Sequence, residues 1–135
     1  MANETVVPIN TDTDVVAARQ KGRELATVLG FVSTDSTLLA TAISELARNI
    51  IRYAKKGEIL IASVQSGDRV GITVVARDNG PGIANISLAM QDGFSTGKSL
   101  GLGLPGAKRL SNEFDITSKV GQGTTVTIIR WKNGL

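Results

Sequence analysis

The chain has 135 residues, of which 41% are hydrophobic and 20% charged, with a formal net charge of +3. It contains no cysteine and no histidine, which excludes a disulfide framework, thiol catalysis, Cys-based zinc sites and any histidine triad or imidazole base. The 15 basic residues are scattered, and no apolar run approaches the roughly 18 residues of a membrane span. We therefore expect one globular domain over 1–135, cytoplasmic, with neither nucleic acid nor membrane as a partner.

The first part of the chain predicts an edge strand followed by two helices. Residues 5–9 are mostly β-branched and include Pro8, a combination typical of edge strands. Helix-capping residues precede an apolar pattern over 15–29, and Gly30 ends it. A second helix is predicted from residues 33–36 to 53 or 54, with its apolar residues on one stripe.

The rest of the chain predicts two hairpins separated by a glycine-rich segment and a helix. The segment 79–103 is non-repetitive, and a segment of that length inside a compact domain usually serves a function. The elements expected are strands at 58–65, 70–78, 114–120 and 124–131, a helical turn at 86–90, and a helix at 103–112. Because the strands cluster in hairpins, we expect a mostly antiparallel sheet with helices on one face, a two-layer α+β fold.

The sequence suggests two familiar phosphate-binding motifs, but one lacks the required spacing and the other lacks the required structural context. The run Gly-Lys-Ser at 97–99 suggests a Walker A loop, but that motif needs four residues between its glycines, and Gly93 leaves three. The run 101–106 matches Gly-x-Gly-x-x-Gly, but no βαβ unit surrounds it. Both retain a glycine-rich loop that enters a helix N-terminus, a setting that favours phosphate.

Polar side chains on the second predicted helix share one face. Glu45 and Asn49 are four residues apart, and Arg52 joins them three residues later. At 100° per residue they lie well away from the apolar stripe, so a carboxylate and a carboxamide project together from the polar side. The same pattern is also typical of an ordinary solvated helix face.

An acidic residue, Asp78, ends the second strand of the first predicted hairpin. Asp78 follows an apolar run and begins the sequence Asp-Asn-Gly-Pro-Gly at 78–82. At the buried edge of a sheet it needs a hydrogen-bonding partner, for which the exocyclic amine of a purine is suited. Gly80 and Gly82 would let the backbone approach a ligand closely, although a plain β-turn is the alternative.

Two further segments complete the pattern. The glycine-rich loop 96–104, which contains Lys98, predicts either a mobile lid or a simple connector. The last hairpin turns at 121–123, and the hydroxyls of Thr124 and Thr125 follow it. Alone, this last feature predicts only a turn.

Taken in chain order, these segments resemble the GHKL ATPase superfamily, which includes gyrase, Hsp90, histidine-kinase and MutL-type nucleotide-binding domains. Residues 45–49 are similar to its N-box, 78–82 to its G1 box, 101–104 to its G2 box, and 123–124 to its final Gly-Thr element. The resemblance covers nearly the whole chain. It implies the Bergerat α/β sandwich, with ATP held between helices and sheet under a lid.

The resemblance also implies residue roles. Glu45 would be the general base, Asn49 would bind the Mg²⁺ that bridges the phosphates, and Asp78 would accept a hydrogen bond from the adenine amine. Backbone N–H groups of 101–104 would hold the phosphates. The residues expected to bind the nucleotide are Asn49, Asp78, Gly80, Gly82, Lys98, Gly101, Leu102, Gly103, Leu104 and Thr124.

Within the superfamily, a short chain without an acceptor histidine resembles the small bacterial serine kinases of partner-switching systems. The run 101–110, with its Pro105–Gly106 pair, is similar to the switch-kinase branch of the stressosome. That branch implies phosphorylation of Ser or Thr on STAS-domain scaffold or antagonist proteins, then release to activate a PP2C-type phosphatase. The alternatives are an anti-sigma factor kinase, a nucleotide-binding adaptor without turnover, and an ATPase that transfers phosphate to water.

Overall fold

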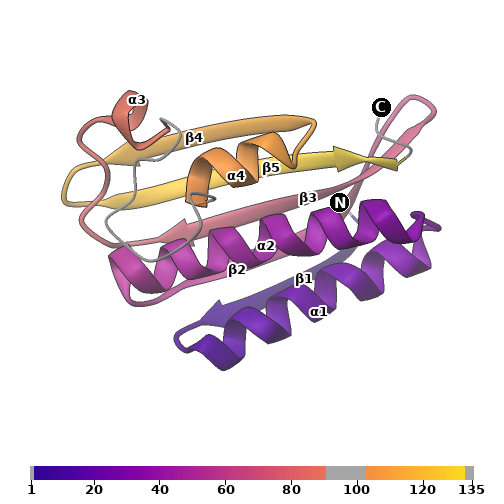
Figure 1. The fold of residues 1–135 in the computed structure, drawn as a ribbon, viewed down its shortest axis with the longest axis horizontal. Helices are drawn as coiled ribbons and strands as arrows, with labels where there is room; N and C mark the ends of the chain where they lie inside the picture. The colour runs from indigo at the N-terminus through magenta and orange to yellow at the C-terminus, as the bar shows by residue number, and fades with distance from the viewer. Residues whose placement is uncertain (1, 91–102, 133–135) are drawn as a thin grey trace.

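The computed structural model describes residues 2–90 and 103–132, which form a two-layer arrangement of sheet and helices (Figure 1). The five strands pair antiparallel in the order β1-β2-β3-β5-β4. The elements are β1 Ala2–Ile9, α1 Asp12–Val28, α2 Ser33–Ala54, β2 Gly57–Ser66, β3 Arg69–Asp78, α3 Ile86–Ala89, α4 Gly103–Arg109, β4 Glu113–Lys119 and β5 Gly123–Trp131. Helices α1, α2 and α4 lie on one face of the sheet. The α+β fold with helices on one face is thus confirmed.

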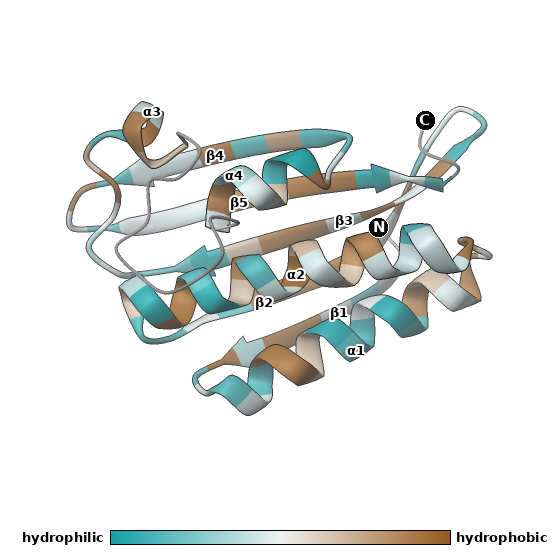
Figure 2. Ribbon diagram, viewed as in Figure 1, coloured by the Kyte–Doolittle hydropathy of each residue, from teal (hydrophilic) through white to brown (hydrophobic). Residues whose placement is uncertain are grey.

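The core lies between the two layers and is almost entirely aliphatic. Alternate residues of each strand point toward the helices, and α2 contributes the stripe expected from its sequence. Figure 2 shows hydrophobic stretches of β1 and β5 behind the helices. Among the described residues, the largest fully buried side chains are Ile9, Leu39, Ile43, Leu46, Ile50, Ile59, Ile61, Ile72, Val74 and Ile128.

Local signals account for where α1 begins and ends. Asp14 accepts hydrogen bonds at Oδ2 from the backbone N–H groups of Asn10 (2.8 Å) and Thr11 (3.0 Å) at the start of α1. These donors, first that of Asn10, lower the pKa of the Asp14 carboxyl. Gly30 has φ of 82° after α1, the left-handed conformation that glycine permits. The chain then reverses into α2, as predicted.

Every described boundary lies within three residues of the sequence expectation, and one of the largest differences, at the end of α4, is explained by contacts with β5. Helix α4 ends at Arg109 instead of residue 112, because Asn112 already belongs to the sheet edge. Its N–H donates to the Ile129 carbonyl at 2.9 Å, and its Oδ1 accepts from the Trp131 N–H at 2.7 Å. Of the helices in the described ranges, none has the length and apolar character to cross a bilayer.

Candidate functional site

Three polar side chains occupy one row at the end of the sheet. Asp78 on β3 is paired with Thr124 on β5, and Thr124 is paired with Ser118 on β4. Ala76 lies two residues before Asp78 on β3, and Val126 lies two residues after Thr124 on β5; both are buried in the core beneath the helices. Because side chains two residues apart on a strand point to the same face, the row faces the helix layer. Asp78 is half-buried and Thr124 is buried. A carboxylate and two hydroxyls therefore lie side by side between the layers.

The loop after β3 is held against the β4–β5 turn by close backbone contacts. The Gly121 N–H donates to the Pro81 carbonyl at 2.8 Å. Gly82 has φ of 77°, and a Cβ added there would collide with the carbonyl oxygen of Lys119. Gly123 has φ of 120°, and its added Cβ would strike the carbonyl oxygen of Asp78. Only glycine allows these two segments to meet at this distance.

The Asp78 carboxylate has one oxygen committed and one available. Oδ1 accepts the Gly80 N–H at 2.9 Å, whereas Oδ2 has no hydrogen-bond partner among residues 2–90 and 103–132. Oδ2 is therefore available to accept a hydrogen bond from water or from a ligand. This arrangement fits the exocyclic amine of an adenine, the group that the sequence assigned to Asp78.

Glu45 departs from the expectation of a polar helix face. It is only 6% exposed, although the helical pattern placed it away from the apolar stripe of α2. Helix α4 packs over this face, and the Gly103 N–H at its start donates to Glu45 Oε2 at 2.9 Å. Arg48 Nη1 donates to Oε1 at 3.2 Å. The Glu45 carboxylate is thus enclosed with both of its oxygens bonded, whereas Asn49 on the same face is half-buried and Arg52 is exposed.

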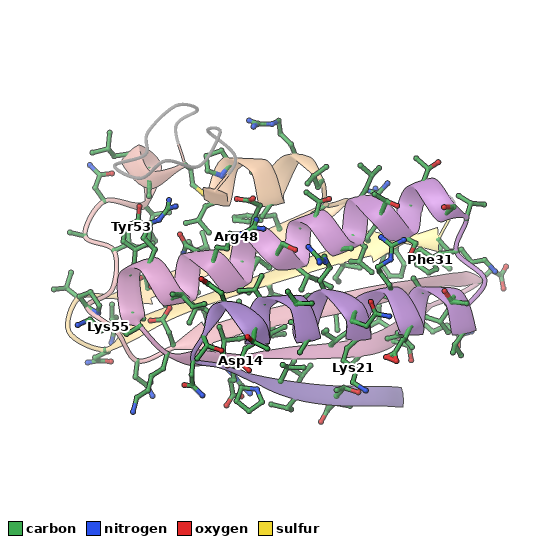
Figure 3. The ribbon with its side chains drawn as sticks, turned by 60° about the horizontal axis from the view of Figure 1, so that its bottom comes forward. Asp14, Lys21, Phe31, Arg48, Tyr53 and Lys55 are labelled. Carbon is green, nitrogen blue, oxygen red and sulfur yellow. The ribbon has the colours of Figure 1, made fainter. Side chains whose placement is uncertain are left out.

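Asn49 lies one turn beyond Glu45 and is half-buried. Its side-chain amide has no hydrogen-bond partner within the part of the chain that the structure describes. Figure 3 shows Arg48 and Tyr53 on the same side of α2, toward α3 and α4. The loop after β3 meets α2 at its last residue, where a Cβ added to Gly80 would collide with Ala54.

Asn49 offers one neutral oxygen as a metal ligand on α2. In the described residues, no group of three or more acidic side chains gathers to hold a metal ion. Mg²⁺ typically takes only one or two protein oxygens and completes its octahedron with water and substrate phosphates. The Asn49 amide oxygen is the ligand that the family resemblance implied for Mg²⁺.

Of the residues expected at the phosphates, Lys98, Gly101 and Leu102 lie outside the described ranges. Gly103 begins α4 and bonds Glu45, as given above. The Leu104 side chain is 5% exposed and packs in the core, so any contact of this residue with a ligand would be made by its backbone.

A hollow of about 530 Å³ opens beside Asp78 at the same end of the sheet. It is lined by Asn10, Ala54, Lys56, Gly57, Glu58, Arg77, Asp78 and Asn79. Arg77 and Glu58 form an ion pair of 2.6 Å in its wall. Asn49 and Thr124 are not among the lining residues, so the hollow adjoins the row described above without covering it.

Ser118 and Arg48 were not selected as site residues from the sequence. Ser118 could have been predicted to face the helices, because it continues the alternation of inward-facing Phe114 and Ile116 on β4. For Arg48, the sequence offered only a spacing of three residues from Glu45, a pattern of opposite charges that many surface helices share.

Residues 34–134 match the family described as "Histidine kinase-, DNA gyrase B-, and HSP90-like ATPase". The match includes α2, the Asp78 loop and the Thr124 hairpin. The chain belongs to this ATPase family, as the resemblance in its sequence implied.

Two relatives and one solved structure refine this placement. Serine/threonine-protein kinase RsbT of Bacillus subtilis (strain 168) is 50% identical over 131 residues, covering 97% of this chain and 98% of that protein. Anti-sigma F factor of Anoxybacillus flavithermus (strain DSM 21510 / WK1) is 34% identical over 117 residues, covering 77% and 79%. The mycobacterial sensor histidine kinase MprB matches with a TM-score of 0.57 at 16% identity over 100% of both chains, which supports the fold alone.

Proposed function

We propose that this protein is an ATP-dependent serine/threonine protein kinase of a partner-switching pathway. The observation that carries this function is the 50% identity to a serine/threonine-protein kinase over 97% of the chain. The anti-sigma F factor is less similar, at 34% identity over 77% of the chain. The charged and amide side chains that the function needs are present on α2 and at the end of β3.

Asp78 and Thr124 supply the base-recognition part of the site. The available Oδ2 of Asp78 accepts from the adenine amine, and Gly80 and Gly82 let the loop after Asp78 pack closely against Ala54 and Lys119. A carboxylate at this position repels the 6-oxo group of guanine, because two acceptors would face each other. The site formed by Asp78 and Thr124 therefore selects a 6-amino purine.

The phosphates are assigned to the glycine-rich segment that enters α4, with Lys98, Gly101, Leu102, Gly103 and Leu104. The Gly103 N–H donates to Glu45 in this structure, so its contact with a phosphate would replace that bond. The Asn49 amide oxygen would hold Mg²⁺, which supplies charge neutralisation to the phosphates when it is bound. Asn49 also orients the substrate relative to Glu45, because both project from neighbouring turns of α2.

Glu45 is the general base of the transfer. As the acceptor hydroxyl oxygen forms its bond to the γ-phosphorus, the bond from that phosphorus to the bridging oxygen breaks, ADP leaves, and the hydroxyl proton passes to the Glu45 carboxylate. Enclosure of Glu45 by Gly103 and Arg48 fixes the carboxylate in place. Positioning of this kind is the main contribution that a protein makes to phosphoryl transfer.

The acceptor is assigned to a Ser or Thr of a STAS-domain scaffold or antagonist protein, and the later partner to a PP2C-type phosphatase. This assignment rests on the resemblance to the switch-kinase branch, and the 50% identity supports that branch over the anti-sigma one.

The test is transfer of labelled γ-phosphate from Mg·ATP to a candidate STAS-domain protein from the same source. We expect label on Ser or Thr, and its loss in Asp78→Asn, whose amide presents a donor to the adenine amine. That exchange should weaken ATP binding by roughly 2–4 kcal/mol. Asp115→Asn is the matched control, because Asp115 is exposed on β4.

Other results would redirect the assignment. ATP binding without transfer, together with capture of a sigma factor, would favour the anti-sigma role. Release of phosphate to water without labelled protein would favour a plain ATPase. Absence of ATP binding in the wild type would contradict the nucleotide site itself.

A further inference from the structure

Ser118 makes three polar contacts at the end of the sheet. Its Oγ accepts the Ile83 N–H at 2.7 Å, donates to the Gly123 carbonyl at 3.1 Å, and lies 2.8 Å from Thr124 Oγ1. Ile83 belongs to the loop that follows Asp78 and packs on the core. Ser118 therefore joins the loop after β3 to the β5 side chain beside Asp78.

The hydrogen-bonding capacity of the Ser118 hydroxyl determines how the Thr124 hydroxyl is oriented. A serine hydroxyl has one hydrogen and two acceptor sites. With one acceptor site taken by Ile83 and the hydrogen given to Gly123, the remaining acceptor site receives the Thr124 hydrogen. This is the arrangement in which all three contacts are hydrogen bonds. Thr124 Oγ1 then offers only lone pairs to anything bound beside Asp78.

Thr124 is paired directly with Asp78 across β3 and β5. The row consequently presents two acceptors in succession, the Asp78 carboxylate and the Thr124 hydroxyl oxygen, to a ligand between the layers. Such a pair suits an exocyclic amine, which can donate one of its two hydrogens to each acceptor, and disfavours a carbonyl at the same position, which would face two acceptors.

We propose that Ser118 is a positioning residue for base recognition: by taking the Thr124 proton, it keeps Thr124 an acceptor and so strengthens selection of a 6-amino over a 6-oxo purine. This inference rests on the proposed nucleotide site and adds to it a residue that does not itself touch the base. Without Ser118, the Thr124 hydroxyl rotates freely and donates to a 6-oxo group.

The experiment measures calorimetric affinities for ATP and for inosine triphosphate, which carries a 6-oxo group. In Ser118→Ala we expect the preference for ATP over inosine triphosphate to fall by about 3- to 10-fold, the equivalent of one hydrogen bond. Ser118→Thr keeps the hydroxyl and should restore the preference. Thr117→Ala is the matched control, because this neighbouring β4 residue is exposed.

A second pair of variants tests the route of the effect. Thr124→Val removes the hydroxyl while keeping the side-chain shape, and it should reduce the preference by a similar factor without depending on Ser118. If Ser118 acts through Thr124, the double variant should show no further loss of preference than Thr124→Val alone. Trp131 is the single tryptophan and lies at the opposite end of β5, so its fluorescence reports whether each variant is folded.

The outcomes separate the two proposals. Equal weakening of both nucleotides in Ser118→Ala, with an unchanged ratio, would overturn this inference and leave the nucleotide site standing, because a purely structural serine gives that result. An additional loss in the double variant would overturn it as well. A wild type that binds no ATP would overturn the proposed function, and this inference with it.

Discussion

Glu45 and Gly103 are 58 residues apart in the sequence and joined by a hydrogen bond of 2.9 Å, from the Gly103 N–H to Glu45 Oε2. The bond ties the middle of α2 to the first residue of α4. It places the proposed base directly against the segment assigned to the phosphates. The Glu45 carboxylate therefore has two roles: it bonds α4 to α2, and it is the proposed base of the transfer. Substitutions can separate these roles.

Glu45→Gln should separate those roles. Glutamine keeps an oxygen that can accept from Gly103, and the half-exposed Arg48 can turn from the new amide to solvent, so the free energy of unfolding should change little. Phosphoryl transfer should slow by about 10²–10⁴-fold. Glu45→Ala should slow transfer as well and cost about 1–3 kcal/mol of stability, because the Gly103 N–H loses its partner. Single-turnover transfer and urea unfolding followed by Trp131 fluorescence give the two quantities. Equal transfer rates in wild type and Glu45→Gln would remove Glu45 from the mechanism.

Asn49→Ala should raise the magnesium concentration needed for ATP binding, because the amide oxygen assigned to the metal is lost. The fold should be retained, since the Asn49 side chain has no partner among the described residues. The measurement is ATP affinity as a function of Mg²⁺ concentration, with Gln20→Ala, an exposed amide on α1, as control. An identical magnesium dependence in Asn49→Ala and wild type would contradict the metal assignment.

Gly123→Ala and Gly121→Ala form a matched pair within one turn. Both glycines have positive φ, 120° and 81°, but an added Cβ meets nothing within 4 Å at Gly121 and collides with the Asp78 carbonyl at Gly123. We expect Gly121→Ala to cost about 1 kcal/mol of backbone strain and to bind ATP normally. Gly123→Ala should displace Asp78 and weaken ATP binding by at least tenfold. Equal affinities in the two variants would show that the contact of Gly123 with Asp78 is unimportant.

Two ion pairs of different burial should differ in their contribution to stability. Arg130 and Asp35 are 2.9 Å apart with side chains 11% and 15% exposed, and Arg130 also donates to the Leu110 carbonyl at 2.7 Å. Asp35→Ala leaves this guanidinium enclosed without its counter-charge and should cost about 3–5 kcal/mol.

The exposed pair provides the comparison. Glu58 and Arg77 have side chains 41% and 50% exposed, so Glu58→Ala should cost about 0–1 kcal/mol. Urea unfolding of both variants measures the difference. A cost for Asp35→Ala no larger than that for Glu58→Ala would show that the Arg130 pair does not hold α2 to β5.

Local patterns were sufficient to locate the described elements and the ends of most of them. Strand alternation and the α2 stripe depend on near neighbours, and so do the cap formed by Asp14 and the stop at Gly30. The order of Glu45, Asn49, Asp78 and the glycine-rich run was also sufficient to identify the ATPase family, because the spacing of those segments is specific.

The surroundings of the same residues depended on contacts far along the chain. Helix α4 decides whether Glu45 meets solvent. The partners of Ser118 depend on the register of β4 and β5 and on the loop after β3, which brings Ile83 to Ser118. No local periodicity contains these contacts, because they arise from the packing of segments that approach only when the sheet and helices assemble. The sequence by itself thus determined the fold class, the family and the residue types of the site, while the tertiary structure decided which of them are enclosed and which hydrogen bonds orient them.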